Sequence, residues 1–337
     1  MTAPLLPQLA ARLREAAHPG GEPCGCGAAV TLAERPDATV LLHADVVAKA
    51  HAPDTDPAGL AFRLATAARV PDVFVPPLGT APATLGDRLA TLWPYGTPVD
   101  PDTPDDAPWE AAGDLLARLH RTPADVAVPA RLHRTSEAAA VPGPPCPAPA
   151  PPPMRGPRKA ARAITRLRTA LTHADTPAAP PVLRAWAALP GWARGTSPMP
   201  GPAVLCHGDL HLGQLVRYPA PDGPWRLIDV DDLGVGVPAW DLARPAAWYA
   251  CGLLAPDEWT RFLGAYRAAG GPAVPARADP WPALDVPARA LTVQTAALAI
   301  TKARAADRPL DEAERALIDA CARMECAPPE LTPGFPK

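Results

Sequence analysis

Two short segments between residues 204 and 232 combine carboxylate and amide side chains in a pattern that suits phosphoryl transfer. The first, at 204–216, reads VLCHGDLHLGQLV and places Asp209 and the amide of Gln214 five residues apart between apolar segments. The second, at 225–232, reads WRLIDVDD and is typical of a strand that ends in acidic residues. Phosphoryl transfer needs one carboxylate to orient the attacking hydroxyl, and an amide oxygen with a further carboxylate to hold magnesium on the phosphates. Two such loops can converge on one site.

The string H-G-D-L-H-x-G-Q at 207–214, followed by I-D-x-D at 228–231, resembles the aminoglycoside phosphotransferase family. Members of that family are small-molecule kinases with the protein-kinase-like fold, and the resemblance spans roughly residues 28–270. It implies that Asp209 is the catalytic base, that His207 braces the catalytic loop, and that Asp229 is the main magnesium ligand. The cofactors that the resemblance implies are ATP and magnesium.

Three more residues near these motifs are candidates for the site. Gln214 replaces the usual Asn as a magnesium ligand; its side-chain oxygen is still a hard ligand, and its L-G-Q context also resembles the maltokinase branch. Asp241 matches the position that supports the catalytic loop from the next helix. Asp231 is a candidate contact of the metal, the substrate or a neighbouring amide.

The segment VVAK at 46–49 resembles the strand that delivers the ATP-binding lysine, whose ammonium neutralises the α- and β-phosphates. Lys49 is one of only four lysines in the chain, which favours this role over that of an edge-strand lysine that blunts aggregation. In the stretch LWPYG at 92–96, backbone groups of Trp93 and Tyr95 would contact adenine at the hinge. A plain linker between lobes is the alternative.

The sequence departs from the family pattern in two places. Family members carry a Glu in the helix after the lysine strand, yet residues 50–109 contain no Glu, and Asp54 and Asp56 are the candidate substitutes as partners of Lys49. The expected phosphate loop at 34–39 contains no glycine, so its backbone amides are not predicted to cradle phosphates as a glycine-rich loop does.

The hydrophobic pattern predicts strands first and helices afterwards. Strands are expected at 28–33, 38–42, 45–50, 73–78 and 85–95, with one helix at 58–69. Helices are expected at 109–120, 159–172, 182–188, 239–254, 257–269, 288–305 and 311–324.

This order predicts an α+β, bilobal, protein-kinase-like fold with a small antiparallel-sheet N-lobe and a larger, mainly helical C-lobe. We expect an N-terminal extension at 1–27, the N-lobe at 28–95 and the C-lobe at 96–337. Nine of the seventeen residues at 141–157 are proline, which predicts an exposed, polyproline-like insertion in the C-lobe.

The composition of the chain limits which binding partners and which cellular compartment we expect. The chain is 48% hydrophobic and 20% charged with a net charge of −3, so it carries no electrostatic footprint for nucleic acid or an anionic membrane. We find no secretory signal and no apolar run of membrane-spanning length. The seven cysteines lack paired C-x-x-C spacing, which favours reduced thiols in a cytoplasmic protein over a metal or redox role for Cys24 and Cys26.

The function expected is ATP-dependent O-phosphotransfer to a hydroxyl of a small molecule of the aminoglycoside, sugar or amino-alcohol class. The alternative is a catalytically degenerate pseudokinase that binds nucleotide in a sensing or scaffold role, motivated by the two N-lobe departures. A protein kinase is disfavoured, because no long activation segment follows Asp229. The choice of ATP over GTP and the oligomeric state stay open at this stage.

Overall fold

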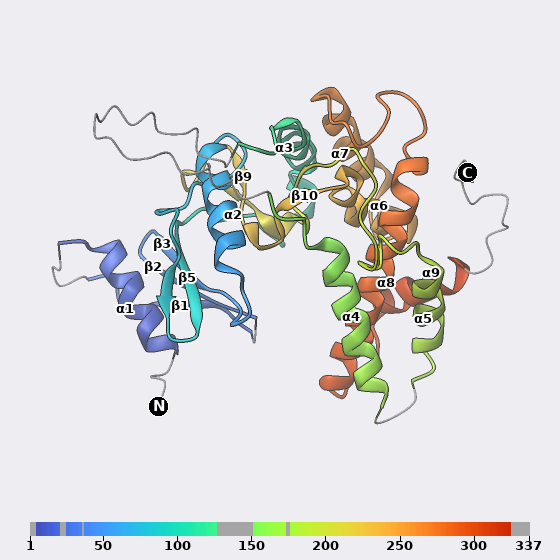
Figure 1. Cartoon of the computed structure of the whole chain (residues 1–337), viewed down its shortest axis with the longest axis horizontal. Coiled ribbons are helices and arrows are strands. Elements are labelled where there is room, and N and C mark those ends of the chain that lie inside the picture. Colours follow the sequence, from blue (N-terminus) through green and yellow to red (C-terminus); the bar gives the residue numbers. More distant parts are fainter. Residues whose placement is uncertain (1–4, 21–24, 36, 127–150, 173–175, 325–337) are drawn as a thin grey trace, which may run out of the picture. The chain divides into compact units, whose positions relative to one another are not determined.

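The computed structural model describes residues 5–20, 25–35, 37–126, 151–172 and 176–324. The chain divides into two compact units, each made of several segments. Unit 1 consists of residues 1–100, 123–152 and 213–231, and unit 2 of residues 101–122, 153–212 and 232–337. Both α and β structure are present. The five-stranded antiparallel sheet lies in unit 1 and most of the helices lie in unit 2, as the sequence predicted (Figure 1).

Unit 1 is built on a five-stranded antiparallel sheet with the strand order β1-β2-β3-β5-β4. Its strands are β1 (Val30–Arg35), β2 (Ala38–His43), β3 (Val46–Ala50), β4 (Ala83–Leu85) and β5 (Arg88–Pro94). Side chains alternate between buried and half-buried along β2 and β3, as expected for a sheet with one covered face. Strand β3 lies between β2 and β5, so its lysine is not on a sheet edge.

Two helices accompany this sheet. Helix α1 (Leu5–Ala17) was not predicted from the sequence; it packs on β2 and β3 and buries Leu9 and Leu13 completely against the sheet core (Figure 1). Helix α2 (Pro57–Arg69) follows β3. Its N-terminus is capped by Asp56, which accepts hydrogen bonds from two backbone amides of the first turn.

A second, three-stranded sheet in unit 1 has the order β6-β8-β9, with β6 (Thr97–Pro98), β8 (Leu215–Arg217) and β9 (Trp225–Leu227). The β8–β9 hairpin pairs Leu215 with Leu227. The Ile228 amide then donates to the Gln214 carbonyl oxygen at 2.9 Å. This bond places residue 214 and residue 229 next to each other at the open end of the hairpin.

Unit 2 surrounds a long central helix, α8 (Trp281–Ala305), against which α4, α5, α6 and α9 pack. Helix α3 pairs closely with α7: a Cβ at Gly113 would overlap backbone atoms of Phe262 and Tyr266. A two-stranded ladder, β7 (Val204–Cys206) with β10 (Gly234–Gly236), lies in the same unit. The other helices are α3 (Trp109–Arg121), α4 (Gly156–Leu171), α5 (Ala179–Ala188), α6 (Ala243–Ala250), α7 (Pro256–Ala268) and α9 (Glu312–Met324). Short 3-10 helices lie at η1 (Pro104–Asp106), η2 (Leu212–Gln214), η3 (Val230–Asp232) and η4 (Pro238–Trp240).

Three sequence expectations need correction. Residues 73–78 are not a strand; only Phe74 makes an isolated bridge, with Leu227, and the apolar run is a buried connection that ends in two prolines. The helix expected at 239–254 is a 3-10 turn followed by α6. Helix α8 starts seven residues earlier than expected and contains Pro287 in its interior, a position that proline usually disfavours.

The proline-rich stretch at 141–157 is only partly described, since residues 141–150 lie outside the described residues. From Pro153 onward the chain is ordered beside β10: Pro153 bridges Val235, and the Met154 amide donates to the Val235 carbonyl oxygen at 3.0 Å. Pro157 then occupies the first turn of α4, where its missing N–H leaves no helical bond unmade. The end of the stretch is therefore part of the packed structure.

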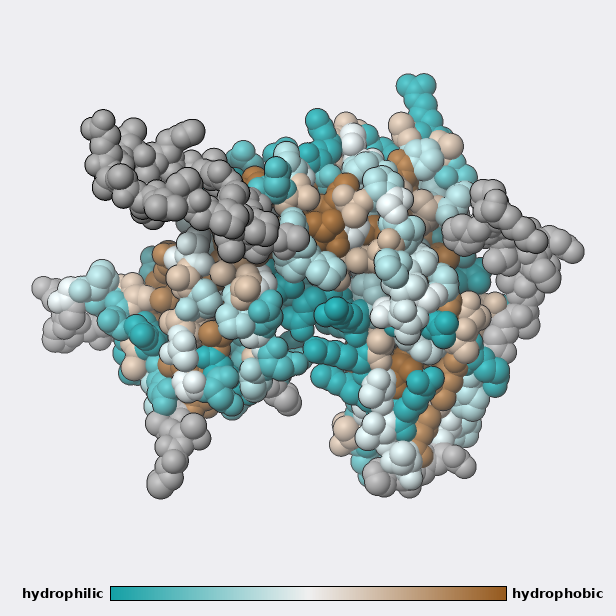
Figure 2. All heavy atoms as spheres, viewed as in Figure 1, coloured by the Kyte–Doolittle hydropathy of each residue, from teal (hydrophilic) through white to brown (hydrophobic). Residues whose placement is uncertain are grey.

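The surface of the described residues is mixed. Figure 2 shows hydrophilic and hydrophobic residues alternating in small groups over the visible face. Within the described part of the chain, no helix combines the length and the apolar character needed to cross a membrane.

Candidate active site

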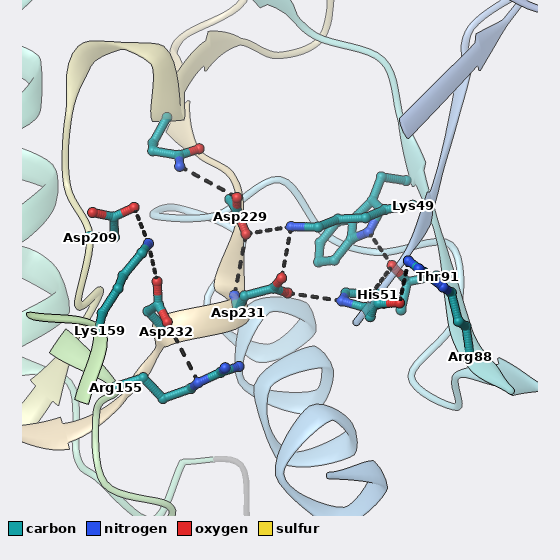
Figure 3. A network of polar contacts seen from close by, with 12 residues as sticks. Lys49, His51, Arg88, Thr91, Arg155, Lys159, Asp209, Asp229, Asp231 and Asp232 are labelled. Atoms are coloured by element: carbon teal, nitrogen blue, oxygen red, sulfur yellow. Dashed lines mark hydrogen bonds and ion pairs between the residues drawn. The ribbon is translucent and has the colours of Figure 1, made fainter. Parts of the chain in front are cut away.

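The first group of candidate residues lies in unit 1 around Lys49, on the central strand β3. Its Nζ donates to Asp229 Oδ1 at 2.6 Å and lies 3.0 Å from Asp231 Oδ2 (Figure 3). Asp229 follows β9 and has φ 60°, in the left-handed region that Asp and Asn tolerate better than most residues. This turn brings two carboxylates to one ammonium.

A buried histidine extends this group. His51 lies two residues after Lys49, so both side chains project from the same side of the strand. Its Nδ1 lies 3.0 Å from Asp231 Oδ1, and its Nε2 lies 2.9 Å from the Thr91 hydroxyl (Figure 3). Asp231 is thus held between a lysine and a histidine.

The donor set beside Lys49 fits magnesium. Gln214 donates through Nε2 to Asp229 Oδ2 at 3.4 Å, so the two side chains lie next to each other. Gln214 and Asp229 together offer amide and carboxylate oxygens, the hard ligands that magnesium prefers. These are the two residues that would hold the ion.

Lys49 has a partner in place of the missing helix Glu. That partner is Asp231, together with Asp229, and not Asp56, which caps α2. At the expected hinge, the Trp93 indole donates to the Thr91 hydroxyl at 2.9 Å. The Tyr95 amide donates to the Asp45 carbonyl oxygen at 2.7 Å, so the backbone N–H of residue 95 already has an acceptor.

The second group lies in unit 2 and centres on Asp209, in the loop after β7. Its two carboxylate oxygens each accept from a cation: Oδ2 from Lys159 Nζ and Oδ1 from Arg244 Nη2, both at 2.5 Å. Arg244 also donates through Nε to the Leu210 carbonyl oxygen at 3.1 Å. Arg244, at the start of α6, thus contacts both the carboxylate and the backbone of the loop.

Lys159 also binds a second carboxylate. Its Nζ donates to Asp232 Oδ2 at 2.7 Å, and Arg155 Nε lies 3.7 Å from Asp232 Oδ1 (Figure 3). Lys159 is in the first turns of α4, and the start of this helix is fixed because a Cβ at Gly156 would overlap the Trp240 indole. Packing at the helix start therefore determines where the ammonium lies.

Asp241 supports the loop that carries Asp209 through hydrogen bonds to the loop's backbone. This fully buried carboxylate accepts from the His207 amide at 2.6 Å and from the Gly208 amide at 2.7 Å. Gly208 has φ 86°, and a Cβ there would lie 2.5 Å from the Asp232 carbonyl oxygen, so glycine is required. The central glycine of the H-G-D motif is therefore required for steric reasons.

A buried chain of hydrogen bonds holds Asp241 in turn. The Ala273 amide donates to the Tyr266 hydroxyl at 2.9 Å, and this hydroxyl lies 2.8 Å from His120 Nδ1. His120 Nε2 lies 3.0 Å from Asp241 Oδ2. The two ring nitrogens of His120 thus join the Tyr266 hydroxyl on one side to the Asp241 carboxylate on the other.

A sequence model described as the phosphotransferase enzyme family (APH) matches residues 47–281. The chain belongs to the phosphotransferase enzyme family. The match contains both groups of residues described above, and it covers well over half of the chain. None of the curated proteins searched matches this phosphotransferase.

Solved structures confirm the kinase-like fold of this phosphotransferase. A choline/ethanolamine kinase family protein from Mesorhizobium loti is 18% identical with a TM-score of 0.52, and the match covers 95% of this chain and 96% of that one. Choline kinase from Cryptosporidium parvum is 9% identical with a TM-score of 0.55 and 88% coverage of both chains. A spectinomycin phosphotransferase, solved with ADP and spectinomycin, is 13% identical with a TM-score of 0.52, covering 89% of this chain and 94% of that one.

Ion pairing keeps Lys49 and Asp231, in unit 1 of the phosphotransferase, in their charged forms. Burial alone would lower the pKa of the Lys49 ammonium, but Asp229 and Asp231 outweigh it and raise that pKa above its ordinary value. Burial likewise opposes ionisation of Asp231, yet Lys49 and His51 hold its pKa well below the ordinary value. At neutral pH, Lys49 is a cation and Asp231 an anion.

In the unit 2 group, ion pairing likewise outweighs the effect of burial on the pKa values of Asp209 and Lys159. Burial would raise the pKa of Asp209, but Lys159 and Arg244 hold it below its ordinary value. Burial would lower the pKa of Lys159, and Asp232 and Asp209 raise it instead. Burial and the Arg244 cation lower the pKa of His211, in the same loop, to about 4, so this imidazole is neutral at neutral pH.

Sequence reasoning missed one residue in each group of contacts, His51 in unit 1 and Lys159 in unit 2. Lys159 follows the proline-rich stretch, where no motif marks it; its rarity as one of four lysines was the available signal. His51 has the strand parity of Lys49, which was the corresponding signal for a shared face. Neither observation predicts which carboxylates Lys159 and His51 contact.

We predict that Asp241→Ala strongly destabilises the phosphotransferase, because two buried amides and His120 lose their acceptor. The expected loss in free energy of unfolding is about 3–5 kcal/mol, as for a buried pair that loses one partner. Asp285→Ala is the control, since Asp285 forms an accessible i,i+4 pair with Arg289 and should cost less than about 1 kcal/mol. Urea unfolding measures both, and equal losses would contradict the brace.

Proposed function

We propose that this small-molecule phosphotransferase transfers the γ-phosphoryl group of ATP to a hydroxyl group of a small molecule. The observation that carries the proposal is the catalytic-loop carboxylate Asp209, which is ionised, half-buried and oriented by two cations on a loop braced by Asp241. The family match supports phosphoryl transfer. Solved relatives of similar fold include a spectinomycin phosphotransferase bound to ADP and a choline kinase, which act on small molecules with hydroxyl groups.

In unit 1, the proposed roles concern the nucleotide. Lys49 donates to phosphate oxygens and offsets their charge, and Asp231 with His51 keeps the ammonium in place. Gln214 and Asp229 hold magnesium, which when bound neutralises charge on the phosphates. Backbone groups of Trp93 and Tyr95 contact adenine, with the Tyr95 carbonyl oxygen as the acceptor.

In unit 2, the proposed roles concern the acceptor. Asp209 accepts the hydrogen bond of the substrate hydroxyl and orients its oxygen for in-line attack, then receives the proton as the new bond forms. His207 contributes through its backbone amide, which ties the loop to Asp241. Lys159 and Arg244 keep Asp209 ionised and fix its orientation.

The alternative, a nucleotide-binding pseudokinase, is not favoured. It was motivated by the absent N-lobe Glu and the glycine-free phosphate loop. The Lys49–Asp231 ion pair at 3.0 Å supports the proposal that another carboxylate takes the place of that Glu. We propose aminoglycosides, sugars and amino alcohols as the acceptor classes to test. The direct experiment is magnesium-dependent ATP turnover with pooled members of each class; acceptor-dependent turnover supports the proposal, and nucleotide binding without turnover on any pool would favour the alternative.

We predict that Asp209→Ala lowers turnover by about 10² to 10⁴, the range for loss of a general base. The physical reason is that the hydroxyl loses both its orienting acceptor and the group that takes its proton. Steady-state kinetics with the best acceptor measures the loss, and Asp319→Ala, an exposed aspartate on α9, is the control. Turnover near that of the wild type would remove Asp209 from the reaction.

We predict that Asp229→Ala abolishes the magnesium dependence of nucleotide binding, because the ion loses its carboxylate ligand. Calorimetric titration of ATP with and without magnesium measures this. The control is Asp222→Ala, at an exposed position in the loop between β8 and β9. An unchanged affinity for magnesium-ATP would exclude Asp229 from the metal site.

We predict that Lys159→Met lowers kcat by roughly 10- to 100-fold, the loss that corresponds to one charged hydrogen bond, with little change in nucleotide affinity. Since Lys159 lowers the pKa of Asp209, its removal should also move the acid limb of the pH–rate profile to higher pH. Lys159→Arg should restore part of the activity. Lys302→Met, at an exposed position on α8, is the control; an unshifted pH profile in Lys159→Met would contradict the assignment.

A further inference from the structure

Three metal-ligand side chains converge in unit 1 outside the groups described above. His18 directly follows α1, Cys26 lies in the loop before β1, and His43 ends β2. One ligand atom from each lies within 4.8 Å of those of the other two. We propose that His18, Cys26 and His43 bind a zinc ion.

The distances fit tetrahedral zinc coordination. The Zn–S and Zn–N bond lengths and a tetrahedral angle together require about 3.6 Å between a thiolate sulfur and an imidazole nitrogen on one ion. Cys26 Sγ and His18 Nε2 are 3.7 Å apart. The rings of His18 and His43 lie 5.3 Å apart, nearly perpendicular at 84°, so both can direct a nitrogen to one point.

The frame that carries these ligands is well packed. Helix α1 is fixed to the sheet by Leu9 and Leu13, both fully buried, and this fixes the position of His18 just beyond its end. His43 is 3% exposed and belongs to the buried set of β2 side chains. Gly27, at φ 79°, lets the loop turn sharply next to Cys26. Packing thus fixes the segments that carry His18 and His43, and Cys26 lies beside them in an exposed loop.

The chemistry of the donors selects the metal. One thiolate and two imidazoles suit zinc and are poor ligands for magnesium, which prefers the oxygens of Gln214 and Asp229. Cys26 is exposed and His18 half-buried, so the ion has access from solvent and water can take the fourth position. Zinc here would link the end of α1 and the loop before β1 to β2, and would stabilise the sheet that carries Lys49.

The test uses the full chain purified under reducing conditions. Zinc content is measured by mass spectrometry; the zinc is then removed with a chelator and cobalt(II) is titrated in under anaerobic conditions. We expect one equivalent of metal per chain, and absorption bands of a tetrahedral cobalt site with a cobalt–thiolate charge-transfer band. Adding zinc to the metal-free protein should raise Tm.

Variants identify the ligands. Cys26→Ser should lose the cobalt–thiolate band and the zinc-dependent rise in Tm, while Cys251→Ser, a half-buried cysteine at the end of α6, should keep both. Because His43 is buried and its replacement can unfold the sheet, His18→Ala tests the histidines and should lose the tetrahedral bands. Circular dichroism checks that each variant is folded. A wild-type protein without the thiolate band, or a Cys26→Ser variant that retains it, would overturn the proposal.

Discussion

Ionised carboxylates removed from water must be matched by cations or by N–H donors, and the site residues of both units satisfy this constraint. In unit 1, Asp231 lies between Lys49 and His51. In unit 2, Lys159 is shared by two aspartates, and Asp241 is matched by two amides and a histidine. An uncompensated buried charge costs several kcal/mol, so the match at the fully buried Asp241 stabilises the fold as well as positioning the loop.

This constraint explains how Lys49 can do without a glutamate on the following helix. In protein kinases, a Lys–Glu pair with that helix must be in place for activity, so movement of the helix can control the enzyme. Here the partner of Lys49 is Asp231, two residues beyond Asp229, and the aspartate before α2 serves as a helix cap. Orientation of the lysine therefore depends on the segment after β9, which carries both aspartates.

The sequence predicted the candidate residues that lie within short motifs. It did not predict ion pairs between distant residues or structure that depends on tertiary packing. Lys49, Asp209 and Asp229 were found because each is in a string of fixed spacing. The ion pairs of Lys159 escaped prediction because they join residues 50 and 73 positions apart, and nothing local marks them. In the same way, periodicity does not separate a strand from a buried irregular segment, which is why residues 73–78 were misread. The helix expected at 288–305 also begins earlier than predicted, because α8 continues through Pro287 and packs against four other helices.

The two cations on Asp209 bear on its proposed role as a base. A carboxylate whose pKa is held low is a weak proton acceptor, so proton abstraction before attack would be unfavourable at this residue. Phosphoryl transfer through a loose transition state has little need of early abstraction, because bond formation to the incoming oxygen lags behind departure of the leaving group. What such a reaction requires is an acceptor fixed in position and ionised at every working pH. Lys159 and Arg244 provide both properties, since each fixes one oxygen of Asp209 and each disfavours its protonation.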